Sequence, residues 1–287
     1  MASNKNFMRT YTLKCGPKGK KGFEIGNIKS ANETVLHVSF SVEKSDAESP
    51  NTAKIQIWNL SDKNVKVLDS KDCIVELNAG YNMNMAPILI GAVTSAVTVP
   101  DNADRMSELE IVDGRIALRD TKVNISYNGS VNSKKIYQYV ANQMGVSIVF
   151  AKGLKFKTFP NGYSYVGKAK NILKKLVRSN RHSWTIQNNV LQITKKGTPV
   201  STKGYLINYS TGLIGNPKKI SLGNSTDTKK AQTGWEVEFF LNGAIGINDT
   251  VKLESDVVKG YFLVKKITFD GDNFEGDWIA TAQLLKI

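Results

Sequence analysis

Two residue types that carry much catalytic and disulfide chemistry are scarce in this chain of 287 residues. It has two cysteines, Cys15 and Cys73, and two histidines, His37 and His182. Two cysteines so far apart do not make a disulfide framework or a four-ligand zinc site, so we expect both to be reduced and packed as small apolar side chains. With so few histidines, a catalytic triad would need one of them beside a nucleophile and an orienting acid, and the spacing indicates none.

Long apolar runs are missing as well. No run approaches the roughly 20 residues that a membrane-spanning helix needs, and the first residues lack the apolar core of a secretory signal. We therefore expect a chain that is made in the cytoplasm and does not insert into a membrane.

Acidic residues are absent from the middle of the chain. Between Thr121 and Thr226 there is no Asp or Glu, whereas the same stretch holds 17 Lys and Arg. The remaining 181 residues hold 22 basic and 25 acidic residues, so the net charge of +14 comes entirely from this stretch. A solubilising surface normally mixes both signs, which makes the one-sided charge informative.

Several of these basic residues surround a predicted helix that runs from about Lys168 to Ser179. Its apolar residues recur at helical spacing, which leaves the basic ones outward or flanking. The candidate docking residues are Lys168, Lys170, Lys174, Lys175, Arg178 and Arg181. Three interpretations stay open: solvation of helix faces, contact with DNA phosphates, and electrostatic docking to an acidic partner, in which complementary charge steers assembly.

Most of the chain has the period-two alternation of β-strands. Residues 1–118 contain six short alternating runs between turn clusters and are predicted to be all-β; in one run, Val38, Phe40 and Val42 share an apolar face with Leu36. Residues 201–287 contain five further runs, with a polar loop expected at 223–234. Closure into a barrel is the arrangement that removes exposed strand edges.

The stretch 119–200 changes period. Asn132 and Ser133 are suited to cap the start of a helix, and Gly145 lies where the left-handed residue at its C-terminal end is expected. The pair Asn188–Asn189 suits the positive dihedral angles of a two-residue hairpin. We therefore predict a mainly β (α+β) fold with two antiparallel, tube-like β-barrel domains, residues 1–118 and 201–287, and a small basic α/β domain inserted at 119–200.

Two loops superficially suggest ligand sites. Residues 16–22 (GPKGKKG) lack the order of a phosphate-binding loop and the helix that should follow, so a basic hairpin loop is the better interpretation. Residues 270–276 (DGDNFEG) offer oxygens to Ca²⁺ but lack the twelve-residue spacing and the final bidentate Glu. Acidic pairs such as Glu108 with Glu110, or Glu236 with Glu238, alternate along strands and are expected on exposed faces. We predict no catalytic, metal or cofactor site.

Segments in both terminal thirds carry a family resemblance. They are residues 53–61, 75–81, 90–93, 210–217, 235–255, 260–264 and 269–278, the last a hairpin with a Gly-Asp corner and a Trp. In this order they resemble the baseplate hub proteins of phage tails and related contractile injection machines. The resemblance implies two barrels per subunit and a homotrimer, so that six barrels ring an axis and match a hexameric tail tube.

The resemblance implies a structural, non-enzymatic hub of the virion tail, assembled in the bacterial host cytoplasm. It would link the tail tube to the spike or tip protein, contact other baseplate proteins and the tape-measure protein, and let double-stranded DNA pass without specific binding. A channel through which a genome passes should not bind the DNA tightly. This favours docking to a protein over contact with DNA as the role of the basic residues. The alternatives are a nucleic-acid or cell-surface binding module and, less favoured, a cell-wall hydrolase.

Overall fold

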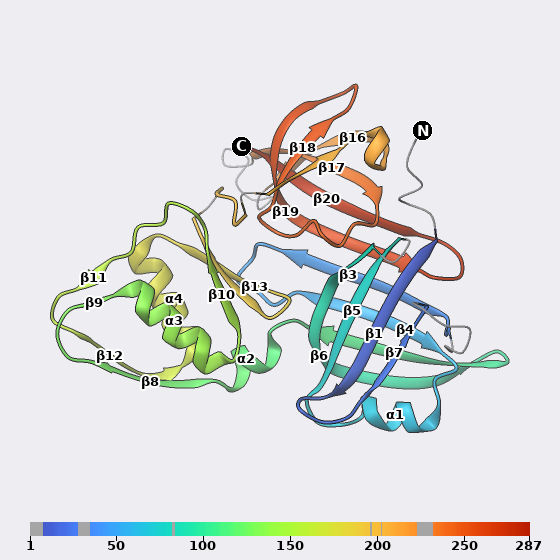
Figure 1. The fold of residues 1–287 in the computed structure, drawn as a ribbon, viewed down its shortest axis with the longest axis horizontal. Coiled ribbons are helices and arrows are strands. Elements are labelled where there is room, and N and C mark those ends of the chain that lie inside the picture. Colours follow the sequence, from blue (N-terminus) through green and yellow to red (C-terminus); the bar gives the residue numbers. More distant parts are fainter. Residues whose placement is uncertain (1–7, 28–34, 82–83, 196, 202, 223–231) are drawn as a thin grey trace.

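The computed structural model describes residues 8–27, 35–81, 84–195, 197–201, 203–222 and 232–287, so most of the loop predicted at 223–234 lies outside the described residues. Figure 1 shows a large sheet built from both ends of the chain and a separate lobe built from its middle. The fold is mainly β, as the sequence predicts. The helices of the middle lobe and its mixed three-stranded sheet lie together on one side of the molecule.

The first third of the chain folds largely into strands. Their inward residues alternate with outward ones, and Val38, Phe40 and Val42 are buried as predicted, whereas Leu36 is only partly buried. The strands are β1 (Arg9–Pro17), β2 (Phe23–Gly26), β3 (Val38–Ser45), β4 (Thr52–Trp58), β5 (Cys73–Tyr81), β6 (Asn84–Asp101) and β7 (Asp104–Val112).

The prediction that residues 1–118 are all-β was wrong, because two short helices occur there. Helix α1 (Asp62–Leu68) is capped by the Ser61 side chain, which accepts a hydrogen bond from Asn64 N, and it buries only Leu68. Helix α2 (Arg115–Asp120) spans the predicted boundary at 118/119. Helices this short carry almost no apolar periodicity, and of the two only α1 has a side-chain cap that could signal it in the sequence.

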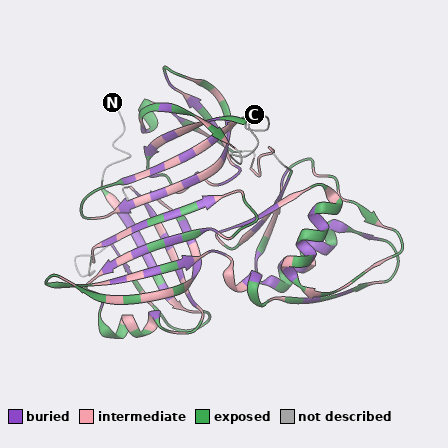
Figure 2. Ribbon diagram, turned by 180° about the vertical axis from the view of Figure 1, so that it is seen from behind, coloured by how far each residue is buried: buried purple, intermediate pink, exposed green. Residues whose placement is uncertain are grey.

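The middle of the chain builds a lobe with its own apolar core. Asn132 caps α3 through a hydrogen bond from Lys134 N, and Gly145 ends that helix at φ 66°, both as predicted. The elements are β8 (Lys122–Tyr127), β9 (Val131–Asn132), α3 (Ser133–Met144), β10 (Ser147–Phe150), β11 (Thr158–Phe159), β12 (Tyr163–Lys168), α4 (Ala169–Asn180), β13 (Ser183–Gln187) and β14 (Val190–Thr194). The apolar sides of α3 and α4 are buried within the lobe (Figure 2).

The last third returns to strands. Its strands match the five predicted runs, and β16 is an additional strand with a register shift between Ile214 and Lys218. The elements are β15 (Gly204–Ile207), the 3-10 turn η1 (Tyr209–Thr211), β16 (Leu213–Leu222), β17 (Gln232–Phe240), β18 (Thr250–Glu254), β19 (Lys259–Asp272) and β20 (Trp278–Lys286).

Strands from the two ends of the chain form one sheet. Within the described residues its path is β16-β17-β20-β19-β3-β4-β7-β6-β5-β1-β2, with β18 paired to β19 and β15 paired to β18. The two ends meet where β19 pairs antiparallel with β3, Phe269 opposite Val42. One apolar core runs beneath both ends. This path does not close into a barrel among the described strands, so the pairings leave the predicted two-barrel arrangement unestablished.

Aromatic packing secures this seam between the chain ends. The Phe40 ring meets Trp278 edge-on with ring centroids 5.3 Å apart, and Trp278 Nε1 donates to Gly80 O at 3.0 Å. Gly271 lies opposite Phe40 in the register, where an added Cβ would come within 2.2 Å of the phenyl ring. The seam thus depends on a glycine that leaves room for an aromatic side chain.

Candidate docking surface of the basic lobe

Helix α4 carries most of the predicted docking residues. Its buried side consists of Ala169, Ile172, Leu173, Leu176 and Val177. The opposite side places Lys174, Lys175 and Arg178 in solvent. Because the helix repeats every 3.6 residues, these three form one ridge along its outer surface.

The other predicted residues lie at or near the ends of the helix. Lys168 is the N-cap residue and is exposed, Lys170 is half-buried in the first turn, and Arg181 is the exposed C-cap residue at φ 57°. The structure therefore brings all six predicted residues onto one helix and its two ends. Docking through these residues stays a prediction.

Strand pairing enlarges the surface beyond the helix. Lys168 ends β12 directly opposite Lys122 on β8, and both side chains are exposed. Like charges that face each other across two strands destabilise the pair. Every ion pair found between described residues lies outside residues 121–226. The lobe thus presents positive charge with no acidic residue of its own to balance it.

Aromatic rings underlie several lysines of this lobe. Lys175 Nζ lies 5.0 Å from the centre of the Tyr165 ring, and Lys135 Nζ lies 5.2 Å from that of Tyr127. Lys134 and Lys157 lie over phenylalanine rings in the same way. These rings also pack against the apolar core of the lobe. A lysine above and the core below leave little free ring face for stacking of nucleic-acid bases. The surface is therefore suited to recognition by charge.

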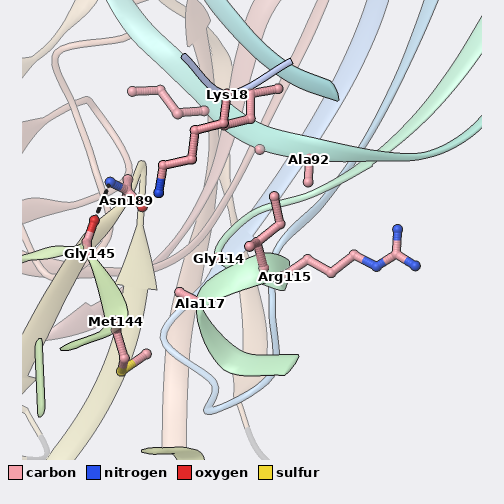
Figure 3. Close-up of a pocket in the computed structure, with 12 residues that line it drawn as sticks. Lys18, Ala92, Gly114, Arg115, Ala117, Met144, Gly145 and Asn189 are labelled. Atoms are coloured by element: carbon pink, nitrogen blue, oxygen red, sulfur yellow. Dashed lines mark hydrogen bonds between the residues drawn. The ribbon is translucent and has the colours of Figure 1, made fainter. Parts of the chain in front are cut away.

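A cavity of about 150 Å³ lies between the basic lobe and the large sheet. Figure 3 shows Lys18 reaching from the β1–β2 loop towards Asn189 and Gly145, with Met144 on the lobe side. The Lys18 ammonium lies near Gly145, at the C-terminal end of α3, where the helix dipole favours positive charge. Small-molecule sites usually enclose roughly 300–1,000 Å³. This cavity is too small for such a ligand.

The two histidines have structural contacts. His37 stacks on Trp58 with ring centroids 3.9 Å apart, and its Nε2 lies 2.9 Å from Asp272 Oδ2. His182 Nε2 lies 3.1 Å from Lys155 O, and burial lowers the pKa of its imidazole. Neither imidazole lies within hydrogen-bond distance of a Ser, Thr or Cys side chain that the structure describes. Both imidazoles are thus engaged in packing and hydrogen bonds within the fold.

The oxygen-rich loop 270–276 is held by its own hydrogen bonds. Asp272 Oδ1 accepts from Phe274 N at 2.8 Å and Glu275 N at 3.0 Å. Burial raises the pKa of Asp272, but the hydrogen bonds from His37 and from these two amides outweigh burial and hold the pKa below its usual value. Over the ranges that the structure describes, no group of three His, Cys, Asp or Glu is arranged to hold a metal ion. The loop 16–22 connects β1 to β2, as the hairpin interpretation predicts.

Sequence reasoning missed the buried polar residues that attach the lobe to the sheet. Lys44 and Asp113 are 4% and 0% exposed, and Asn51 is buried beside them. One signal was present for Lys44: it continues the inward positions 38, 40 and 42 of β3. A lysine in a row of apolar residues indicates a buried charge with a specific partner.

No helix in the described parts of the chain is both long enough and apolar enough to span a membrane. This finding concerns helices only.

Solved structures with the same fold come from phage tails and a secretion system. The 43 kDa tail protein of prophage MuSo2 from Shewanella oneidensis superimposes with a TM-score of 0.61 at 10% identity, over 97% of this chain and 98% of that one. The tail protein from Neisseria meningitidis MC58 gives 0.58 at 9% identity, over 96% of both chains. No family model and no curated protein sequence matches the chain.

A third structure extends the likeness to a secretion machine. The E. coli c3393 protein, a component of the type VI secretion system with structural similarity to the T4 bacteriophage tail proteins gp27 and gp5, gives a TM-score of 0.60 at 10% identity, over 91% of this chain and 76% of that one. The resemblance to phage tail and baseplate proteins that the sequence predicts is thus confirmed as a likeness of fold.

Proposed function

We propose that this chain is a structural, non-enzymatic hub of a phage-type tail baseplate, which links the tail tube to the spike or tip and forms part of the delivery channel. The observation that carries this proposal is the shared fold over nearly the full length of a prophage tail protein, 97% of one chain and 98% of the other. A likeness over whole chains includes the middle lobe as well as the sheet. The chain would therefore act in the virion tail, after assembly in the host cytoplasm.

The proposed assembly is a homotrimer with two barrel-like domains per subunit, residues 1–118 and 201–287, and the basic domain 119–200 between them. Support comes from the joining of both chain ends at the β3–β19 pair, which holds the two β regions in a fixed relation. Three rigid pairs of β regions would present six similar elements around an axis. The remaining free strand edges would be covered by neighbouring subunits.

The proposed partners are the tail tube protein, the spike or tip protein, other baseplate proteins and the tape-measure protein, with double-stranded DNA passing through without specific binding. We assign the basic surface around α4 to an acidic baseplate partner. Its support is the charge of the lobe together with aromatic rings that lysines and the core already cover.

Light scattering on the purified chain tests the assembly. A trimer has a mass of about 95 kDa, three times the chain mass of 31.6 kDa. The hub proposal expects this mass for the chain alone, or a heavier complex that contains three copies of the chain after addition of the tail tube protein that the same phage or prophage encodes. A monomer under both conditions, with no binding to the tube protein, contradicts it.

A second candidate function is a nucleic-acid or cell-surface binding module, favoured by the charge of the basic lobe alone. Filter binding of duplex DNA over a range of salt separates the two, because affinity for phosphates falls steeply as salt rises. Tight, strongly salt-dependent DNA binding by a monomer would favour this second candidate over the hub.

A further inference from the structure

The hairpin between β13 and β14 packs its tip against the large sheet. Asn188 and Asn189 form the tip, at φ 50° and 62°, the left-handed conformation that a two-residue hairpin requires. Asp113, which follows β7, is fully buried beneath the tip. Its Oδ2 accepts from Asn188 N at 2.7 Å and its Oδ1 from Asn189 N at 3.4 Å. One carboxylate therefore holds both backbone amides of the tip.

A buried lysine holds the same tip from the other side. Lys44 occupies a buried position near the C-terminal end of β3. Its Nζ donates to Asn188 Oδ1 at 2.7 Å, and Asn188 Nδ2 donates to Pro87 O at 2.8 Å. Asn188 thus connects a buried cation to a buried anion, through its side chain and its backbone amide. A single tip residue makes hydrogen bonds to three separate parts of the sheet.

Asn51 completes the attachment. Its Nδ2 donates to Ile186 O and to Gln187 Oε1, both at 3.0 Å, while Gln187 Nε2 donates back to Ser45 O at 2.9 Å. Hydrogen bonds are directional, whereas apolar contacts allow sliding. The cavity lined by Gly114 and Met144 lies beside these contacts. The directional bonds of Asn51 and Gln187 therefore fix how the lobe is oriented on the sheet.

Buried charges are an expensive way to join two units. Charges removed from water are destabilising unless they are paired and hydrogen-bonded, and apolar side chains of similar size often join surfaces at less cost. What a buried polar network adds is a specific geometry, because only one arrangement satisfies all of its donors and acceptors. Outside the tip, the lobe is joined to the sheet by α2 and by a hydrogen bond from Asn248 Nδ2 to Gln192 Oε1 at 3.3 Å.

We propose that Asp113, Lys44 and Asn51 form a latch that receives the Asn188–Asn189 tip and fixes the basic lobe, with its docking surface, at one angle to the large sheet. Release of the tip lets the lobe turn about α2. The latch is a positioning device; its importance for docking rests on the proposed function, whereas its effect on lobe orientation does not.

Distance measurements between two spin labels test the latch on the full chain. Ser179→Cys on α4 and Thr52→Cys on β4 supply exposed attachment points, while the native Cys15 and Cys73 are buried and spared from labelling. With the latch intact, a single narrow distance peak is expected. Asp113→Ala is expected to lose that peak in favour of a broad distribution. The matched control is Glu110→Ala, an exposed carboxylate on β7, which should keep the narrow peak.

Two further variants keep the test decisive if Asp113→Ala does not fold. Asn188→Gly retains the positive φ and the amide bound by Asp113, but removes the acceptor of Lys44, and should broaden the peak partially. Lys44→Met with Asp113→Asn removes both charges together and should broaden it without unfolding the chain. A folded variant of either kind with the wild-type peak overturns the latch. Because the labels report on the isolated chain, this result is independent of whether the chain forms a tail hub.

Discussion

Lys122 and Lys168 face each other directly across the β8–β12 pair, with both side chains in solvent. The two lysines repel each other in the free chain, and none of the ion pairs between described residues includes either of them. A partner that brings carboxylates to this position relieves the repulsion. The free chain is then less stable than it could be at the place where we expect docking.

Lys168→Glu is expected to stabilise the free chain and weaken docking. Replacing a like-charged cross-strand pair by an opposite pair contributes about 0.2–1 kcal/mol to the free energy of unfolding. Urea unfolding measures this gain, and binding to baseplate proteins measures the loss. Lys63→Glu on α1, an exposed lysine outside the basic lobe, is the control for the change of charge. Stabilisation with unchanged binding would leave only solvation as the role of this residue.

Lys174→Glu combined with Lys175→Glu should weaken assembly with a neighbouring tail protein, and more at low salt than at high salt. Dissolved ions screen exposed charges, so the effect of reversing them shrinks as ionic strength rises. Lys63→Glu combined with Lys66→Glu makes the same change of charge on α1 and should leave assembly unchanged. Docking through α4 is ruled out when assembly of the Lys174/Lys175 variant equals that of wild type at both salt concentrations.

Lys44 is expected to give an alkaline signature of the latch. Burial lowers its pKa to about 8, against an opposing effect of Asp113. Between pH 8 and the ordinary lysine pKa of 10.5 the unfolded chain binds this proton and the folded chain does not. The free energy of unfolding therefore gains from this group as pH rises through that window, and the cost of burying the cation is fully present below it.

The measurement compares wild type with Lys44→Met in urea at several pH values. The stability of wild type relative to the variant should rise from pH 8 towards pH 10. The charged groups on the adjoining strand β19 are Lys265, paired with Asp46, and Lys266, paired with Glu43. Wild type and Lys44→Met both contain these pairs, so they do not contribute to the difference between the two proteins. Ile267→Val, opposite Lys44 in the register, changes no titratable group, and its difference from wild type should not vary with pH. A flat curve for Lys44→Met as well would contradict the assignment.

Gly271→Ala should destabilise the seam between the two ends of the chain. Its Cβ would lie 2.2 Å from the buried Phe40 ring, so the ring or the strand must move. Overpacking of this kind costs about 1–3 kcal/mol. Gly204→Ala on β15 is the control, since its Cβ meets only Thr250 O at 3.9 Å. Thermal unfolding with equal midpoints for the two variants would show that the β3–β19 seam tolerates the extra methyl group.

The sequence alone predicted those features whose signal is local. Period-two alternation located the strand runs, and helical spacing with caps at Asn132 and Gly145 located α3. The Asn188–Asn189 pair marked a hairpin whose two positive φ angles the structure confirms. The one-sided charge and the six residues around α4 were also read directly from residue order. Short helices such as α1 were not predicted, because seven residues that bury one leucine show no periodic apolar pattern.

Only the tertiary structure decided which distant segments meet. The pairing of β3 with β19 joins residues more than two hundred positions apart, and alternation says which face of a strand is apolar but not which strand lies beside it. The latch residues Lys44, Asn51 and Asp113 are separated in sequence from the tip they hold. Their burial is set by the packing of the lobe against the sheet, and no residue carries in its own chemistry the identity of the neighbours that packing brings to it.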